Sequence, residues 1–427
     1  MTRILLILIA LLAFVPRPAA AQDPVGSDDV IVIFRGDLNP AQREAVIRQA
    51  GAVPGRHFKS VRASSARLAA PGARQALEGH PDVLEVVPDR PVEAHAKPAG
   101  GGGGGAGQVT PAGVQRIGAA PGALAFAGAG VGVAVVDTGI DFNHADLQPV
   151  EPECFTAFAA CQDDNGHGTH VGGIVAARHN TIDVVGVAPA AGLYAVKVLN
   201  HRGRGSDSSI IAGLDWVAQH AATLAPPIRV VNMSLGRQGT VGDNPALHGA
   251  VQALTGAGIT VVVSAGNDPN RDVSQQIPAA YAEVIAVAST TALGGTSACN
   301  VVPAGIPQDT ASYFTTDGVG VTVSAPGEDR ENVGKNCFLS SVGILSTKLG
   351  GGTTRLSGTS MSAPHVTGVA TLLWEQFETI APETIRGKLT AGAALVGTAP
   401  LNSPSSAYTF DGEREGVLSA PGALAAP

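Results

Sequence analysis

The feature that most constrains this fold is a series of continuous apolar segments, rich in β-branched residues, that alternate with helical patterns beyond residue 108. A strand that is apolar at every position is buried on both faces, as in parallel sheets covered by helices. The sequence therefore predicts an α/β fold with a doubly wound, mostly parallel sheet and helices on both faces. The predicted strands are Val131–Val136, Leu193–Leu199, Val230–Met233, Ile259–Val263, Val284–Ala288 and Val319–Val323. Ligands bind such sheets beyond the carboxyl ends of the strands.

The residues before this region predict a smaller α+β unit, from Asp29 to roughly His95. Its predicted elements are a strand at Val30–Phe34, a helix capped at Asn39 and Pro40 that runs towards Ala50, a helix near Ala69–Glu78 and a strand at Val83–Val87. The glycines from Gly100 to Gly105, continued by Ala106 and Gly107, have no side chains to pack. They predict a flexible linker between two domains.

The first residues have the pattern of a secretory signal peptide, because Arg3 precedes an apolar stretch, Ile4–Val15, and the small residues Ala19–Ala21. The alternative is a membrane anchor, but the stretch is shorter than the roughly 20 residues that span a bilayer. No second long apolar run follows. We therefore expect residues 1–21 to be removed and the mature protein to be secreted, extracellular or periplasmic, without membrane contact.

The four cysteines allow three disulfide pairings, and export makes pairing the expectation because disulfides persist outside reducing compartments. We predict Cys154 with Cys161 and Cys299 with Cys337, since each pair is close in sequence and lies within one region. Sequence alone leaves the other pairings, and free buried thiols, open.

Charge argues against one class of partner. From Gln108 onward the chain has 15 Lys and Arg against 25 Asp and Glu, a net charge of −10, whereas residues 1–107 carry 12 against 10. Nucleic-acid binding relies on clustered basic residues, so the acidic main region predicts that nucleic acid is not a partner.

Asp137 and His167 are candidate catalytic residues. Asp137 directly follows a buried strand, where an unpaired carboxylate is costly and an imidazole is a suitable partner. His167 stands where a glycine-rich segment becomes helical, which combines a fixed position with access. Alone, Asp137-Thr-Gly is a common turn, and the aspartic-protease alternative lacks a second such motif. A zinc site at His167 and His170 lacks the glutamate of a metalloprotease helix, so we expect His170 to be structural.

Ser360 and Asn267 complete the set. Gly358 permits a sharp turn and Pro364 suits a first helical turn, which predicts Ser360 at a helix N-terminus. Backbone N–H groups there face any negative charge that develops beside the hydroxyl. Asn267 follows a strand, and its amide can donate to an oxyanion opposite the Ser360 N–H. Taken singly, Ser360 is an N-cap residue and Asn267 a turn residue.

Together these segments resemble the subtilisin-like serine proteases. The matching segments, in the family's order, are Val135–Ile140, His167–Gly173, Val231–Gly236, Ser264–Asn267 and Ser357–His365. The resemblance runs from about Gln108 to the last residues and implies a triad of Asp137, His167 and Ser360. Asn267 and the Ser360 N–H would form the oxyanion hole. His167 would take the serine proton during attack on the scissile carbonyl, while Asp137 holds the imidazole.

The resemblance also implies a substrate cleft that pairs an extended peptide as an added strand. One wall would be Ser234, Leu235 and Gly236, and the other Gly203, Arg204 and Gly205. Arg204 suggests acidic side chains at outer positions of the substrate. Gln276 falls where the family often has a small residue at the base of the primary pocket, which leaves the preferred side chain open.

A structural calcium ion is implied as well. Its ligands would be the side chains of Gln108, Asp146 and Asn180 and the carbonyl groups of Arg178, Ile182 and Val184. Such a mixture of side-chain and backbone oxygens is what calcium prefers. The alternative is a solvated loop with an unrelated aspartate. No organic cofactor is expected.

The small N-terminal unit resembles the family's propeptide, a ferredoxin-like folding aid and inhibitor. The predicted organisation is a signal peptide at 1–21, a propeptide at 22–97, a linker at 98–107 and a peptidase domain at 108–427, with cleavage between His95 and Gln108. We expect a self-processing, monomeric serine endopeptidase that acts on proteins and peptides and is bound by its own propeptide.

Two other functions fit these residues less well. A catalytically silent, peptide-binding relative is disfavoured because none of the four reacting groups is replaced. An α/β-hydrolase lipase or esterase requires Gly-x-Ser-x-Gly and the chain order Ser, Asp, His, whereas here the serine comes last.

Overall fold

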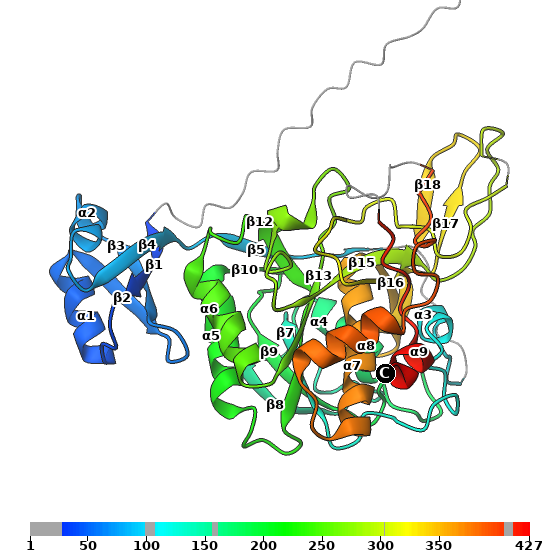
Figure 1. Cartoon of the computed structure of the whole chain (residues 1–427), viewed down its shortest axis with the longest axis horizontal. Helices are drawn as coiled ribbons and strands as arrows, with labels where there is room; N and C mark the ends of the chain where they lie inside the picture. The colour runs from blue at the N-terminus through cyan, green and yellow to red at the C-terminus, as the bar shows by residue number, and fades with distance from the viewer. Residues whose placement is uncertain (1–27, 99–106, 156–160, 303, 405–412) are drawn as a thin grey trace, which may run out of the picture.

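The computed structural model describes residues 28–98, 107–155, 161–302, 304–404 and 413–427 as a small N-terminal unit and a large α/β unit (Figure 1). The predicted signal peptide and nearly all of the predicted glycine linker lie outside the described residues. No helix in these ranges is long and apolar enough to cross a membrane.

The small unit has the order β1 (Asp29–Phe34), α1 (Pro40–Gln49), β2 (Ala52–His57), β3 (Ala63–Leu68), α2 (Ala73–Glu78) and β4 (Val83–Pro88). Its antiparallel sheet has the strand order β2-β3-β1-β4, as in a ferredoxin-like fold. A capping box between Asn39 and Gln42 starts α1 where the sequence predicts it. The second helix was predicted too long, because it starts only at Ala73, after Gly72 has taken a left-handed conformation.

The large unit is built on a seven-stranded parallel sheet in the order β16-β15-β13-β11-β7-β9-β8. Its strands are β7 (Gly132–Asp137), β8 (Pro149–Cys154), β9 (Gly192–Lys197), β11 (Ile228–Met233), β13 (Thr260–Ser264), β15 (Ile285–Thr291) and β16 (Val323–Glu328). The predicted strand Val319–Val323 is wrong, because a turn from Gly318 to Val321 leaves Val319 81% exposed and the strand begins at Val323.

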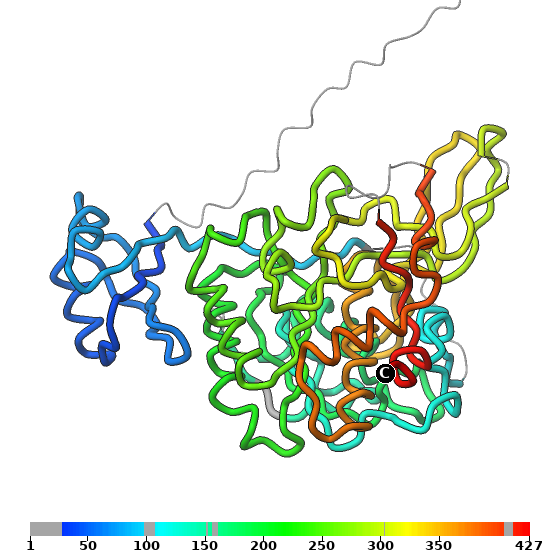
Figure 2. The backbone as a smooth tube through the Cα atoms, viewed as in Figure 1, coloured from blue at the N-terminus to red at the C-terminus, as the bar shows by residue number. Residues whose placement is uncertain are grey.

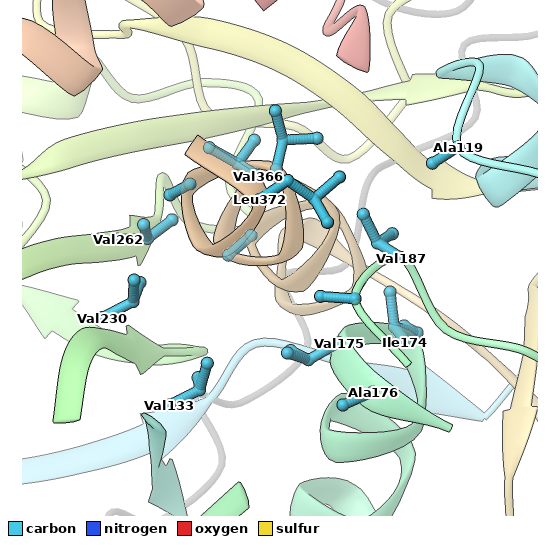
Figure 3. Close-up of a cluster of buried hydrophobic side chains, with 14 of the residues drawn as sticks. Ala119, Val133, Ile174, Val175, Ala176, Val187, Val230, Val262, Val366 and Leu372 are labelled. Atoms are coloured by element: carbon cyan, nitrogen blue, oxygen red, sulfur yellow. The ribbon is translucent and has the colours of Figure 1, made fainter. Parts of the chain in front are cut away.

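Helices cover both faces of this sheet, which confirms the predicted doubly wound α/β class. Alternate residues of β7 enter different cores: Val133 packs with α4 (His167–Ala176) and α7 (Thr359–Phe377), whereas Ala134 packs with α5 (Asp207–His220) and α6 (Pro245–Gly256). Figure 3 shows Val133, Val230 and Val262 of the strands around α7. Shorter helices, α3 (Ala112–Arg116), α8 (Pro382–Ala391) and α9 (Ala420–Ala425), complete the unit.

The sheet of the small unit packs against α5 and α6, and its Ile31, Ile33 and Phe58 join the same apolar cluster as those helices (Figure 1). Two carboxylates fasten this contact. Asp215 of α5 accepts hydrogen bonds from the backbone N–H groups of Lys59 at 2.9 Å and Ser60 at 2.5 Å. At the start of α5, the backbone N–H of Ser208 donates to Asp89 of the small unit at 2.9 Å.

The predicted disulfides, Cys154–Cys161 and Cys299–Cys337, are both confirmed. The second one joins a loop to the turn of a hairpin made by β17 (Arg330–Val333) and β18 (Leu339–Val342). The remaining strands lie around the candidate site: β5 (Pro91–Ala94), β6 (Lys97–Pro98), β10 (Arg204–Ser206), β12 (Leu235–Gln238), β14 (Gln276–Ile277), β19 (Ile344–Thr347) and β20 (Thr353–Ser357).

Candidate active site

Asp137 and His167 meet where the last residue of β7 faces the first residue of α4. Nδ1 of the imidazole lies 2.7 Å and 2.9 Å from the two carboxylate oxygens, and both side chains are buried. The backbone N–H of Thr138 donates to the same carboxylate at 2.6 Å. Because a carboxylate only accepts, the neutral ring carries its proton on Nδ1 and leaves Nε2 as a hydrogen-bond acceptor. Nε2 has no partner in the described chain.

The approach of α4 to β7 depends on Gly168, because a Cβ there would lie 2.1 Å from the Gly139 carbonyl oxygen. Asp163, which sequence analysis missed, organises the turn before the helix. Its carboxylate accepts from the backbone N–H groups of Gly166 at 2.9 Å and Thr169 at 3.0 Å. The acidic residues just before the histidine motif were the available signal for this role.

Ser360 lies in the first turn of α7, directly beyond the Gly358 turn, as predicted. Pro364 was expected in that turn but lies one turn later, where its missing N–H leaves the Ser360 carbonyl without a helical donor. The hydroxyl of Ser234 donates to that carbonyl at 2.9 Å. In return, Oγ of Ser360 donates to the Ser234 carbonyl at 3.0 Å. This exchange ties the candidate nucleophile to the wall of the cleft.

Asn267 presents its amide nitrogen to the same place. The backbone N–H and the hydroxyl of Thr359 both donate to Oδ1 of Asn267, each at 3.0 Å. Since Oδ1 is held by two donors, the amide orientation is determined by its partners. Nδ2 is therefore the atom left to act as a donor in the cleft.

The chain's own segment 91–98 occupies the cleft between the two predicted walls (Figure 2, light blue). β5 pairs antiparallel with β10 on one side and with β12 on the other, as an added strand. Beyond the cleft, β6 pairs with β20. The predicted wall residues Ser234 to Gly236 and Gly203 to Gly205 thus face a bound peptide, and Arg204 forms a 3.0 Å ion pair with Glu93.

The carbonyl group of His95 lies at the meeting point of the candidate residues. Nδ2 of Asn267 donates to this oxygen at 2.7 Å, and the backbone N–H of Ser360 donates at 3.3 Å. Gly358 is needed beside it, because a Cβ at that position would lie 2.1 Å from the same oxygen. Two fixed donors on one carbonyl oxygen, next to a serine hydroxyl and an imidazole–carboxylate pair, are the groups required for acyl transfer.

A space of about 1420 Å³ remains open beside this strand, and residues of the strand line it together with both walls. The basic residues of the large unit in this lining are Arg202, Arg204 and Arg237, whereas Arg56, Arg90 and Lys97 belong to the N-terminal part of the chain. Arg237 is paired with Asp207 at 2.6 Å, and Arg204 is paired with Glu93 of the strand, so the Arg204 contact is the one that suits an acidic side chain in a substrate.

Two other buried histidines have no place in this chemistry. Nε2 of His170 lies 3.0 Å from the Ile344 carbonyl oxygen, and burial lowers the pKa of this residue to about 3. Burial likewise lowers the pKa of His365 to about 4. Both rings are therefore neutral, and we expect these two histidines to support the packing of α7 and β19 rather than to take part in the reaction. Across the residues that the structure describes, no three His, Cys, Asp or Glu side chains form a metal-binding group.

Lys197, at the end of β9, is a second residue that sequence analysis missed. Its side chain is fully buried, and Nζ donates to the Thr138 carbonyl at 2.6 Å and to Asp164 at 2.7 Å. The ammonium group therefore supports the turn that follows Asp137. A lysine inside an otherwise apolar predicted strand was the signal.

The six predicted calcium ligands come together at one place. Nε2 of Gln108 lies 2.6 Å from the Arg178 carbonyl oxygen, and it lies 3.3 Å and 3.0 Å from those of Ile182 and Val184. It also donates to Oδ1 of Asn180 at 3.0 Å. Asp146 lies beside this cluster and accepts from Nδ2 of Asn180 at 2.7 Å. Four oxygens thus surround a single nitrogen of Gln108.

Comparison with known proteins gives a consistent result. Residues 128–412 match the model of the subtilase family. Subtilisin DY of Bacillus licheniformis is 36% identical over 278 residues, which are 64% of this chain and 88% of the relative. Subtilisin E of Bacillus subtilis (strain 168) is 33% identical over 365 residues, 84% of this chain and 83% of the relative.

Among solved structures, fervidolysin from Fervidobacterium pennivorans, a keratinolytic enzyme related to subtilisin, superposes with a TM-score of 0.67 at 22% identity. The match covers 94% of this chain and 61% of that protein, and it supports the fold alone. A cold adapted subtilisin-like serine proteinase gives a TM-score of 0.53 at 31% identity, covering 69% of this chain and 90% of that protein.

Proposed function

Because this chain belongs to the subtilase family and is a subtilisin-like serine endopeptidase, we propose that Ser360, His167 and Asp137 are its catalytic triad. We further propose that it is secreted as a precursor that processes itself. The observation that carries both proposals is the His95 carbonyl, held by Asn267 and the Ser360 N–H within the chain's own cleft.

Peptide hydrolysis then proceeds through an acyl-enzyme. Nε2 of His167 takes the proton of Ser360 as Oγ attacks the scissile carbonyl, and later gives it to the leaving amine. Asp137 keeps the other ring proton on Nδ1 and stabilises the imidazolium. Asn267 and the Ser360 N–H stabilise the oxyanion. One donor of this kind contributes on the order of 10²–10³ in kcat, a value measured in a subtilisin.

The small unit is proposed as the propeptide that inhibits the enzyme until it is removed. In support, its strand β5 fills the substrate cleft and its sheet covers α5 and α6 through Asp89 and Phe58. A peptide that blocks its own cleft keeps the enzyme inactive after the first cleavage. Full activity then requires dissociation or degradation of the small unit. We expect the mature enzyme to act on protein substrates as a monomer.

Secretion is supported by the N-terminal pattern at 1–21 and by the two disulfides, which persist in oxidising compartments. The predicted division into propeptide 22–97, linker 98–107 and peptidase domain 108–427 follows from the same scheme.

A calcium ion is proposed at the cluster around Gln108. The donor set fits, because the four oxygens around Nε2 would face a cation once the amide is turned to present Oε1, and Asp146 supplies negative charge. The ion would crosslink the start of the peptidase domain to the loop at 178–184. We expect Ca²⁺, but not Mg²⁺, to raise the melting temperature of the chain, and Asn180→Ala to abolish that rise. Equal melting temperatures in Ca²⁺ and EDTA would contradict the site without touching the peptidase proposal.

The triad proposal is tested with three full-length chains: the parent, Ser360→Ala and Ser362→Ala. The Ser362 hydroxyl is buried in the same helical turn without a described hydrogen-bond partner, so its removal is the matched control. The parent and the control are expected to cleave casein, to react with a fluorophosphonate and to lose the N-terminal unit. Ser360→Ala is expected to remain an unlabelled precursor. A labelled, active Ser360→Ala chain would refute the assignment.

A further inference from the structure

The side chain of His95 enters a pocket with a donor and an acceptor. Nδ1 lies 3.0 Å from Oγ of Ser264, at the end of β13. The ring also forms a hydrogen bond with the backbone of Gly236, and this bond raises the pKa of His95. Only an acceptor favours the protonated ring, so the ring N–H donates to the Gly236 carbonyl. A Cβ on Gly236 would lie 2.7 Å from Cε1 of the ring, so the imidazole packs directly on the glycine.

This arrangement matches a neutral imidazole, which has one N–H donor and one acceptor nitrogen. With the carbonyl of Gly236 taking the N–H, the hydroxyl of Ser264 is left to donate to Nδ1. The Ser264 side chain is fully buried, and its hydroxyl has no other hydrogen bond among the residues described. A hydrocarbon side chain in this pocket would therefore leave a buried hydroxyl unpaired, which is unfavourable.

A charged ring is disfavoured in the same pocket. Burial, with a smaller contribution from the nearby His167, lowers the pKa of His95 to about 4. The pocket is therefore selective for the neutral ring over lysine, arginine or a protonated histidine.

The backbone on both sides of His95 is held in line with the candidate nucleophile. On one side, the N–H of Ala94 donates to the Gly203 carbonyl at 3.0 Å. On the other, Lys97 pairs with Ser357, three residues before Ser360. The His95 carbonyl lies between these two backbone contacts and accepts from the Asn267 amide. The peptide bond from His95 to Ala96 is therefore the bond placed next to Ser360.

We propose that Ser264 is a specificity-determining residue that gives the primary pocket a preference for histidine, and that His95–Ala96 is the first bond that the enzyme cleaves. The proposal rests on the peptidase function proposed above and sharpens its substrate class. Preferred peptides carry histidine before the cleaved bond, a small residue such as Ala94 before that, and an acidic residue opposite Arg204. The bond lies two residues before the predicted end of the propeptide at 97.

Oγ of Ser360 bonds to the carbonyl carbon of His95 while the C–N bond to Ala96 breaks, and the serine proton passes through His167 to the new amine of Ala96. Water then adds its hydroxyl to the acyl carbon and returns a proton to Ser360. The released fragment ends in the His95 carboxylate, and the remaining chain begins at Ala96.

The cleaved bond is tested by mass spectrometry of the N-terminal fragment at the earliest times of processing of the full chain. We expect a fragment that ends at His95. The end of this fragment is informative because later trimming of the glycine-rich segment does not alter it. A first fragment that ends elsewhere would overturn the assignment of the bond while leaving the triad proposal intact.

The pocket is tested at pH 8 with two internally quenched peptides, Pro-Val-Glu-Ala-His-Ala-Lys-Pro and the same peptide with phenylalanine in place of histidine. The parent enzyme is expected to cleave the histidine peptide with the higher kcat/KM. Ser264→Ala should lower kcat/KM for that peptide about fivefold, equivalent to about 1 kcal/mol for one hydrogen bond, and should raise it for the phenylalanine peptide, because it removes the hydroxyl that phenylalanine leaves unpaired. Ser362→Ala should change neither.

Two results would overturn the role of Ser264: a ratio of the two kcat/KM values that Ser264→Ala leaves unchanged, or faster cleavage of the phenylalanine peptide by the parent. Labelling by a fluorophosphonate is measured in parallel. Loss of labelling and of all peptide cleavage in the parent would instead refute the peptidase function itself, so the two failures are distinguishable.

Discussion

Replacing Glu331 by glutamine is expected to stabilise the folded chain at neutral and alkaline pH. Glu328, the last residue of β16, and Glu331, in β17, are both fully buried. The backbone N–H of Tyr313 donates to Glu331 at 2.7 Å, and the carboxyl groups of Glu328 and Glu331 are close enough for Glu328 to raise the pKa of Glu331. Burial, together with the charge of Glu328, raises the pKa of Glu331 to about 10.

The magnitude follows from the cost of keeping this proton. The ordinary pKa of the group is 4.5, so at pH 7 the unfolded chain is ionised there while the folded chain is protonated. Because pH 7 lies 2.5 units above the ordinary pKa of 4.5, protonating Glu331 on folding costs about 1.4 kcal/mol for each unit, or about 3.4 kcal/mol at pH 7. The stability contribution is fully present below pH 4.5 and declines as the pH rises towards about 10. Glutamine needs no proton, so it avoids the decline.

The assay is scanning calorimetry in a Ser360→Ala background, which prevents self-digestion. With an unfolding entropy of about 2.1 cal/mol/K per residue and roughly 400 folded residues, 3.4 kcal/mol corresponds to about 4 °C at pH 7. The gain of Glu331→Gln should vanish near pH 4.5 and grow towards pH 9. Exposed Glu383→Gln is the control and should show no such trend. A difference in melting temperature that is equal at pH 5 and pH 9 would refute a proton held on the buried Glu331.

The preference for the histidine peptide over the phenylalanine peptide, measured as the ratio of their kcat/KM values, should fall as the pH is lowered below the free pKa of histidine, about 6.5. The fall should be roughly tenfold per pH unit until about pH 4, because a ring bound like that of His95 must first lose its proton. A ratio that is flat between pH 7 and pH 5 would contradict binding of the neutral ring. Arg204→Ala should lower kcat/KM for peptides with glutamate at the Glu93 position by at most about fivefold, and less at high salt, because the ion pair is partly exposed; an effect that persists in 1 M salt would point to a contact other than charge. Removing the Cys299–Cys337 disulfide with a double serine variant should lower the free energy of unfolding by about 4 kcal/mol, because the disulfide restricts a loop of 38 residues in the unfolded chain. Denaturant unfolding of the Ser360→Ala chain measures this change, and an unchanged free energy would mean that the loop is ordered without the bond.

The sequence located the central strands well because their signal is local. Runs such as the one before Asp137 are apolar at every position, and that pattern occurs where a strand is buried on both faces. The edge strand β8 was missed because two prolines interrupt it, and an edge tolerates residues that cannot donate to the ladder. The false strand at Val319–Val323 arose from an apolar run that contains a glycine turn.

The sequence by itself determined the chemistry of the site, because Asp137, His167, Asn267 and Ser360 each occupy the end of an element whose pattern is readable locally. Only the tertiary structure decided how these ends are joined: the exchange between Ser234 and Ser360, the support of Asp163 and Lys197, and the filling of the cleft by residues 91–98. These contacts link residues far apart in the chain, and the pocket around His95 combines a glycine carbonyl and a hydroxyl from two different strands. Their mutual geometry depends on packing, which no local pattern records.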